Sequence, residues 1–128
     1  VRAVRTGNLV FLAGHGPTLP EGGVMRGVIG EDLTLEDGQR AAKLTAVSLL
    51  SSLKQEIGDL SKVKRVVKVL GMVNAETNYT DHSKVINGFS DVIVEVFGPR
   101  GKHARAAVGM GSLPGNMAVE IEMIVEVE

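Results

Sequence analysis

Alternation of apolar and polar residues marks segment 118–127 as a strand that buries one face. Its odd-numbered positions from 119 onward are Val119, Ile121, Met123, Val125 and Val127. Glu120, Glu122 and Glu126 stand between them, and Ile124 interrupts the polar set. Because successive strand side chains point to opposite faces, we expect the odd-numbered residues to face the core and the glutamates to face away from it.

Other segments also have the composition of strands. The long run 63–73 is rich in β-branched residues and predicts a central strand, and the apolar run 9–14 predicts a buried one. Segment 1–5 is its expected hairpin partner, across a turn at Gly7. Two shorter strands are expected near 25–29 and over 105–110, the latter followed by a turn at 113–116.

Period-3.6 patterns predict two helices. Thr34 is the expected N-cap of the first, with Asp37 three residues later and Gly58 at its C-terminal end. Its apolar stripe comprises Ala42, Ala46, Leu49, Leu50, Leu53 and Ile57. Gly38 in the first turn costs about 1 kcal/mol relative to alanine and predicts a ragged start. The second helix is expected over 80–97, with a stripe of Val85, Phe89, Val92 and Val96.

The resulting order, β-β-β-α-β-α-β-β, predicts an α+β fold in which both helices pack on one face of a single sheet. In the central strand, one predicted face carries Val66, Leu70 and Met72 and the other carries Val67, Val69 and Val73. Two helices can cover only one face. We therefore expect another subunit to cover the apolar side chains of the other.

Composition narrows the class of protein. The 128 residues fit one domain, 1–128, and the absence of cysteine excludes disulfides, thiolate nucleophiles and cysteine-based zinc sites. The net charge of −1, with no basic run interleaved with aromatics, predicts no nucleic-acid partner. No apolar stretch approaches the ~20 residues that span a bilayer, so we expect no membrane segment and a cytoplasmic location. The chain begins at Val1, and we expect its natural start to lie upstream.

Two residues are candidates for chemistry. Arg105 begins a strand of small residues after a glycine-rich loop, and its guanidinium suits a carboxylate or phosphate ligand. Glu120 faces away from the core and could act as an acid or base if its strand neighbours that of Arg105. The structural alternatives are a surface ion pair for Arg105 and a solvated glutamate. His15 and His103, in glycine-rich loops, are expected to be solvent-exposed, and the three distant histidines predict no metal site.

The C-terminal pattern resembles the RidA/YjgF family of reactive intermediate deaminases, once called endoribonuclease L-PSP. The resemblance rests on Arg105, on Leu113-Pro114 eight residues later, and on the segment 119–122 with its apolar tail. It continues upstream through segment 7–11 with Gly14, the turn 58–60 leading to Val63, and Asn87 ahead of Phe97-Gly98, and thus spans nearly the whole chain.

The resemblance implies a chorismate-mutase-like α+β fold assembled as a homotrimer with clefts between subunits. It implies that Arg105 grips a substrate carboxylate and that Glu120 directs water onto the C=N carbon of an imine formed from an enamine such as 2-aminoacrylate. The products would be a 2-keto acid and ammonia, and no cofactor would be needed. The backbone of Gly14 and the side chain of Asn87 would lie near the cleft.

The chain departs from the archetypal members of this family at three positions: Ala13 replaces a serine, Ser90 a tyrosine and Ala107 a cysteine. The leading hypothesis is nevertheless an imine deaminase. A non-catalytic trimeric binder of small carboxylates is the alternative, with the same arginine but no productive water. A ribonuclease is the third reading, and the near-neutral charge and scarcity of aromatics argue against it.

Overall fold

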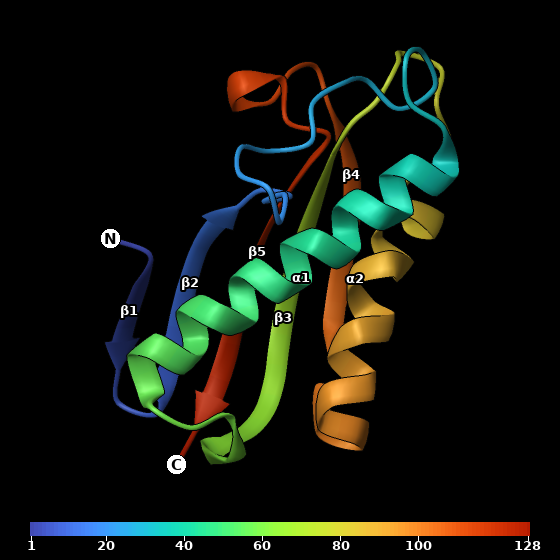
Figure 1. Cartoon of the computed structure of the whole chain (residues 1–128). Coiled ribbons are helices and arrows are strands. Elements are labelled where there is room, and N and C mark those ends of the chain that lie inside the picture. Colours follow the sequence, from blue (N-terminus) through green and yellow to red (C-terminus); the bar gives the residue numbers. More distant parts are fainter.

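The computed structural model describes all 128 residues. Its elements are β1 (Ala3–Thr6), β2 (Leu9–His15), α1 (Leu35–Ile57), β3 (Val63–Asn74), α2 (His82–Phe97), β4 (Ala104–Met110) and β5 (Val119–Val127) (Figure 1). Short 3₁₀ helices lie at Leu60–Lys62, Gly98–Gly101 and Pro114–Asn116.

The five strands form one sheet in the order β1-β2-β5-β3-β4, with both helices on the same face (Figure 1). Strands β3 and β4 are parallel, and the other neighbouring pairs are antiparallel. The crossover between β3 and β4 contains α2. Strand β4 is an edge strand of the sheet and contacts that helix. The predicted α+β architecture, with two helices packed on one face of a single sheet, is confirmed.

The predicted caps fix the ends of α1. The Thr34 hydroxyl accepts from the Asp37 N–H at 3.1 Å, and the Asp37 carboxylate accepts from the Thr34 N–H at 2.9 Å. Gly58 ends the helix with φ of +89°, which a residue with a Cβ adopts only under strain. The predicted ragged start is wrong. Gly38 is buried, and a Cβ there would press against Ile29 and Val85, so the glycine lets the helix pack closely.

Helix α2 buries a slightly different stripe from the one predicted. Val85 and Phe89 are buried as expected, together with Ile86, Ile93 and Phe97. Val96 is 46% exposed, however, and Val92 is only half-buried. The apolar residues of this helix cover more than one face, so the period alone did not decide which of them point inward.

Strand β3 contains two register shifts against β5, between Val63 and Arg65 and between Val66 and Lys68. Val66 therefore lies on the core face with Val69 and Val73, and its predicted grouping with Leu70 and Met72 is wrong. A bulge inserts one residue and reverses the facing of the residues beyond it. In β5 the alternation itself is uninterrupted, because the extra residues of these shifts lie on β3, and all five odd-numbered residues are buried as predicted.

The strand predicted near 25–29 does not form. This segment makes only isolated bridges, Arg26 to Met117 and Ile29 to both Leu33 and Ala75. Two glycines, Gly27 at φ of +140° and Gly30 at +96°, interrupt the extended backbone there. The segment is a long loop that spans the end of the sheet.

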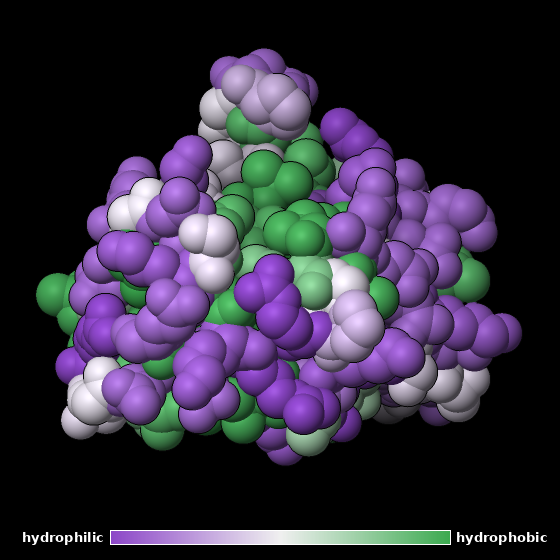
Figure 2. Space-filling view, turned by 90° about the horizontal axis from the view of Figure 1, so that it is seen from below, coloured by the Kyte–Doolittle hydropathy of each residue, from purple (hydrophilic) through white to green (hydrophobic).

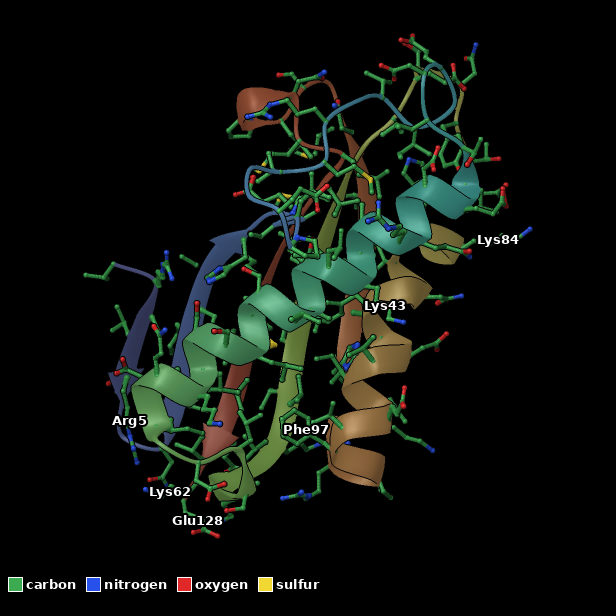
Figure 3. The ribbon with its side chains drawn as sticks, in the orientation of Figure 1. Arg5, Lys43, Lys62, Lys84, Phe97 and Glu128 are labelled. Carbon is green, nitrogen blue, oxygen red and sulfur yellow. The ribbon has the colours of Figure 1, made fainter.

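At the opposite end of the molecule, hydrogen bonds of Glu128 join segments that are far apart in sequence. Arg5 Nη2 donates to the Glu128 carbonyl at 2.8 Å, and the Glu128 N–H donates to the Lys62 carbonyl at 3.0 Å. These three residues gather at one corner in Figure 3. Seen from this end, the surface is mostly polar, with apolar atoms showing in a patch between polar side chains (Figure 2).

Candidate functional site

Two sequence periods bring polar side chains of α2 and β4 together. On α2, Ser83, Asn87 and Ser90 are spaced i, i+4 and i+7, which places them on one helix face. At the start of β4, His103 and Arg105 are two residues apart and point to the same side of the strand. Because β4 lies beside α2, the two sets meet at the edge of the sheet.

Arg105 is held by α2. Its Nη1 donates to Asn87 Oδ1 at 2.9 Å and to Ser90 Oγ at 3.0 Å, and Nη2 makes a longer contact of 3.4 Å with the Ser83 carbonyl. The only salt bridge in the chain joins Lys84 and Asp81, so no carboxylate neutralises Arg105. Arg105 therefore does not form the surface ion pair that was the structural alternative.

His103 continues this network behind the arginine. Its Nδ1 lies 2.6 Å from the Gly101 carbonyl, and its Nε2 lies 2.9 Å from Ser90 Oγ. Burial lowers the pKa of His103, the Gly101 hydrogen bond opposes that shift, and the charge of Arg105 adds to it. The ring of Phe89 packs edge-on against the imidazole, with centroids 6.1 Å apart. We name Arg105, Asn87, Ser90 and His103, with the Ser83 carbonyl, the arginine half-site.

Glu120 lies on the other face of the sheet, opposite the helices. Its half-buried side chain lies across the strand register from Met72 and has no hydrogen bond or ion pair within the chain. The carboxylate rests against Gly14, where an added Cβ would overlap it. A glycine is therefore required at position 14 for the carboxylate to keep this place. We name Glu120 and Gly14 the glutamate half-site.

Within one chain, the two candidate residues Arg105 and Glu120 therefore lie apart. Strand β3 lies between β4 and β5, so Glu120 does not lie on a strand that neighbours the Arg105 strand. Arg105 is in register with Val69, which faces the helices, whereas Glu120 is in register with Met72, which faces away from them. The structure brings Arg105 together with Asn87 and Glu120 with Gly14, but not the two pairs with each other.

The histidines differ from expectation. His15 and His103 are both partly buried and each makes two hydrogen bonds, His15 to the Ala13 carbonyl and Ser52 Oγ at 2.7 Å each. Glycine-rich flanks predicted exposure, but ring nitrogens that find partners on a neighbouring helix favour burial. For His103 the available signal was its spacing from Arg105, which placed both side chains against α2.

The three departures from the archetypal pattern fall in different places. Ser90 belongs to the arginine half-site, where it contacts both Arg105 and His103. Ala107 packs against the core from the helix side of β4. Ala13 is exposed and accepts a hydrogen bond from His15 through its carbonyl.

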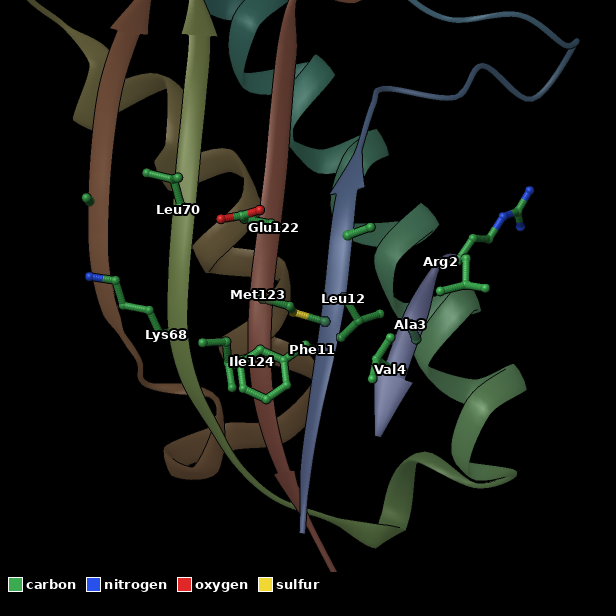
Figure 4. Close-up of a pocket in the computed structure, with 13 residues that line it drawn as sticks. Arg2, Ala3, Val4, Phe11, Leu12, Lys68, Leu70, Glu122, Met123 and Ile124 are labelled. Carbon is green, nitrogen blue, oxygen red and sulfur yellow. The ribbon is translucent and has the colours of Figure 1, made fainter. Parts of the chain in front are cut away.

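The face of the sheet without helices, here called the open face, carries apolar side chains that solvent reaches. Val4 is 53% exposed, Phe11 41% and Val108 40%. A groove of about 530 Å³ runs over this face, lined by Phe11, Ile124 and Leu70 and flanked by Lys68 and Glu122 (Figure 4). Glu120 shares this face, two residues before Glu122 along β5.

No group of three or more His, Asp or Glu side chains is arranged to hold a metal ion. No helix combines the length and the apolar character needed to cross a bilayer.

Comparisons with known proteins place the chain in a family. Residues 4–127 match the family model described as "YjgF/chorismate mutase-like, putative endoribonuclease". Protein TCP17 of Trypanosoma cruzi is 42% identical over 127 residues, covering 98% of this chain and 79% of that protein.

Solved structures agree. The protein Atu1372 of Agrobacterium tumefaciens, described as of unknown function, is 43% identical with a TM-score of 0.97, covering 99% of this chain and 82% of its own. A structure from Shewanella oneidensis, described as a "putative endoribonuclease", is 27% identical with a TM-score of 0.95, covering 99% of this chain and 84% of its own. The chain belongs to the YjgF/chorismate mutase-like family.

Proposed function

We propose that the protein is an imine deaminase that hydrolyses small 2-imino acids, such as 2-iminopropanoate, to 2-keto acids and ammonia. The observation that carries the proposal is an arginine without a carboxylate partner. Arg105 is oriented by three groups of α2, yet its charge is not neutralised within the chain. A guanidinium held this way suits a carboxylate, which it can bind through two parallel hydrogen bonds.

The reaction needs a positioned water. An enamine such as 2-aminoacrylate tautomerises to the imine, whose C=N carbon is electrophilic. Glu120 would accept a proton from water as the water oxygen attacks that carbon, and the proton would pass to nitrogen. When the C–N bond breaks, the water oxygen becomes the keto oxygen and both water hydrogens leave on ammonia. Holding carboxylate and water in one geometry supplies the rate enhancement.

The proposal requires two copies of the chain at each site. Arg105 and Glu120 lie on opposite faces of the sheet of one chain, so a neighbouring subunit must bring its Glu120 to the Arg105 cleft. We propose a homotrimer whose subunits cover one another's open faces. The exposed apolar side chains there, Val4, Phe11 and Val108, support this assembly, since a small monomer rarely leaves such a face bare.

A second candidate is a cytoplasmic binding protein for small carboxylates that does not catalyse. It is favoured by the same separation, because one chain completes the arginine half-site but leaves Glu120 remote from it. RNA cleavage has weaker support, since the chain has a net charge of −1 and only four aromatic Phe and Tyr residues.

The test generates 2-aminoacrylate enzymatically in the presence of semicarbazide, which traps the imine as a semicarbazone. A deaminase competes with trapping, so wild-type protein should lower the initial rate of semicarbazone formation. Arg105→Ala should remove this effect and weaken pyruvate binding about 100-fold, the order expected for losing charge-assisted hydrogen bonds. If wild-type protein binds pyruvate but leaves trapping unchanged, the binding protein is correct and the deaminase is not.

A further inference from the structure

A chain of hydrogen bonds with one consistent direction lies behind Arg105. The Gly101 carbonyl can only accept, so His103 Nδ1, 2.6 Å away, must carry a proton. The lowered pKa keeps the imidazole neutral near neutral pH, which leaves Nε2 as an acceptor. Ser90 Oγ, 2.9 Å from Nε2, must then donate its hydroxyl proton to it.

The direction of that bond fixes what Ser90 offers to Arg105. With its only proton directed at His103, the Ser90 oxygen presents lone pairs to Arg105 Nη1 at 3.0 Å. Asn87 Oδ1 accepts the second Nη1 proton at 2.9 Å, so both Nη1 protons are used within the chain. The Nε–H has no partner in the chain, and it shares one edge of the planar guanidinium with Nη2.

We propose that Ser90 and His103 are positioning residues that turn the Nε/Nη2 edge of Arg105 toward the substrate carboxylate. On this edge Nε has no partner in the chain, and Nη2 makes only the 3.4 Å contact with the Ser83 carbonyl. His103 fixes the direction of the Ser90 hydroxyl, and Ser90 together with Asn87 holds Nη1. Nη2 has two protons and a single long contact, so the Nε/Nη2 edge can still form two parallel bonds to a carboxylate. The inference rests on the proposed carboxylate-binding function and adds the residues that orient its arginine.

The placement of His103 supports a positioning role. Its ring is half-buried between Phe89, the Gly101 carbonyl and Ser90, and it does not contact Arg105 by a hydrogen bond. A small cavity of about 240 Å³ adjoins Ser90, His103 and Arg105, with Lys102 as a further cation and no carboxylate in its lining. An anion near Arg105 would meet a positive surrounding there.

The experiment compares pyruvate binding in Ser90→Ala, Ser90→Thr, His103→Phe and the double variant Ser90→Ala/His103→Phe. We call the hydrogen bonds from His103 through Ser90 to Arg105 the relay. Losing it should raise the Kd about fivefold in Ser90→Ala and in His103→Phe, which is the order of the net free energy of one hydrogen bond. Ser90→Thr keeps the hydroxyl and should restore the wild-type Kd. The double variant should be no weaker than either single variant, because both remove the same relay. Ser51→Ala, an exposed serine of α1, is the matched control.

Nitrogen-15 NMR of the wild-type imidazole supplies an independent readout. We expect Nδ1 of His103 to be protonated and Nε2 bare, and the Arg105 Nε–H signal to broaden in Ser90→Ala as the guanidinium loosens. An Nε2–H tautomer, or a Ser90→Ala protein with wild-type Kd and an unchanged Arg105 signal, overturns the inference. If Arg105→Ala itself binds pyruvate normally, the proposed function fails instead, and the tautomer and Arg105 signals still decide the relay.

Discussion

The arginine half-site and the glutamate half-site differ in how many of their contacts a single chain supplies. The arginine half-site is complete: side chains from α2 and β4 meet, and every polar atom of Ser90 and His103 has a partner. The glutamate half-site has only Gly14 against the carboxylate, and it lies on a face with solvent-exposed apolar residues. The first depends on folding alone, and the second on what covers the open face.

This difference separates binding from catalysis in the proposed mechanism. Arginine held by its own chain can bind a carboxylate whether or not subunits assemble. Water activation by Glu120 requires a second chain to meet the first. Changes on the open face should therefore remove turnover and spare much of the carboxylate affinity, whereas changes in the arginine half-site should affect both.

Phe11→Asp should have the largest effect. Phe11 is 41% exposed on the open face, and a charge there would be desolvated on assembly. We expect sedimentation to show monomers and deaminase activity to fall to the background rate, with unchanged circular dichroism. Pyruvate binding should persist within about tenfold, since the arginine half-site lies within one chain.

Val47→Asp is the control for this variant, because Val47 is 56% exposed on α1, away from the open face. It should leave both assembly and activity unchanged. A Phe11→Asp protein that stays trimeric and active would show that the open face is not the interface.

Glu120→Gln should come second in size. Glutamine keeps the shape of the side chain but cannot accept a proton from water, so kcat should fall about 1,000-fold, within the usual range for general bases. The proposed trimer and the pyruvate Kd should be unchanged. Glu122→Gln changes the next outward-facing glutamate of β5 and should retain full activity. Equal losses in the two variants would point to the charge of the open face as a whole rather than to Glu120.

Much of the fold was predictable because its signals are local. The capping box at Thr34, the Gly58 terminus and the alternation in β5 each depend on residues close in sequence, and all three predictions are confirmed. The facing of β3 was not predictable, because bulges against β5 decide which side Val66 takes. The strand expected near 25–29 failed because Gly27 and Gly30 adopt positive φ.

The candidate site was predictable in part for the same reason. Spacing along α2 and β4 could place Ser90 and His103 beside Arg105, although glycine-rich flanks suggested an exposed histidine. The order of the strands in the sheet could not be predicted, because the residue pattern within a single strand does not indicate which strand pairs with it. The separation of Arg105 from Glu120 arises because β5 pairs with β2 and β3 rather than with β4, which is a long-range choice.

Gly14→Ala tests how tightly one chain fixes the glutamate half-site, and it should have the smallest effect. The new methyl group would overlap the Glu120 carboxylate, which is the end of a flexible side chain and can swing aside at little cost in stability. Displacement by about 1 Å should lower kcat roughly 10-fold to 100-fold while the Kd for pyruvate stays constant. Gly111→Ala, where a Cβ meets nothing within 4 Å, is the matched control. Unchanged kcat in Gly14→Ala would mean that contacts from the neighbouring subunit, rather than Gly14, set the position of the carboxylate.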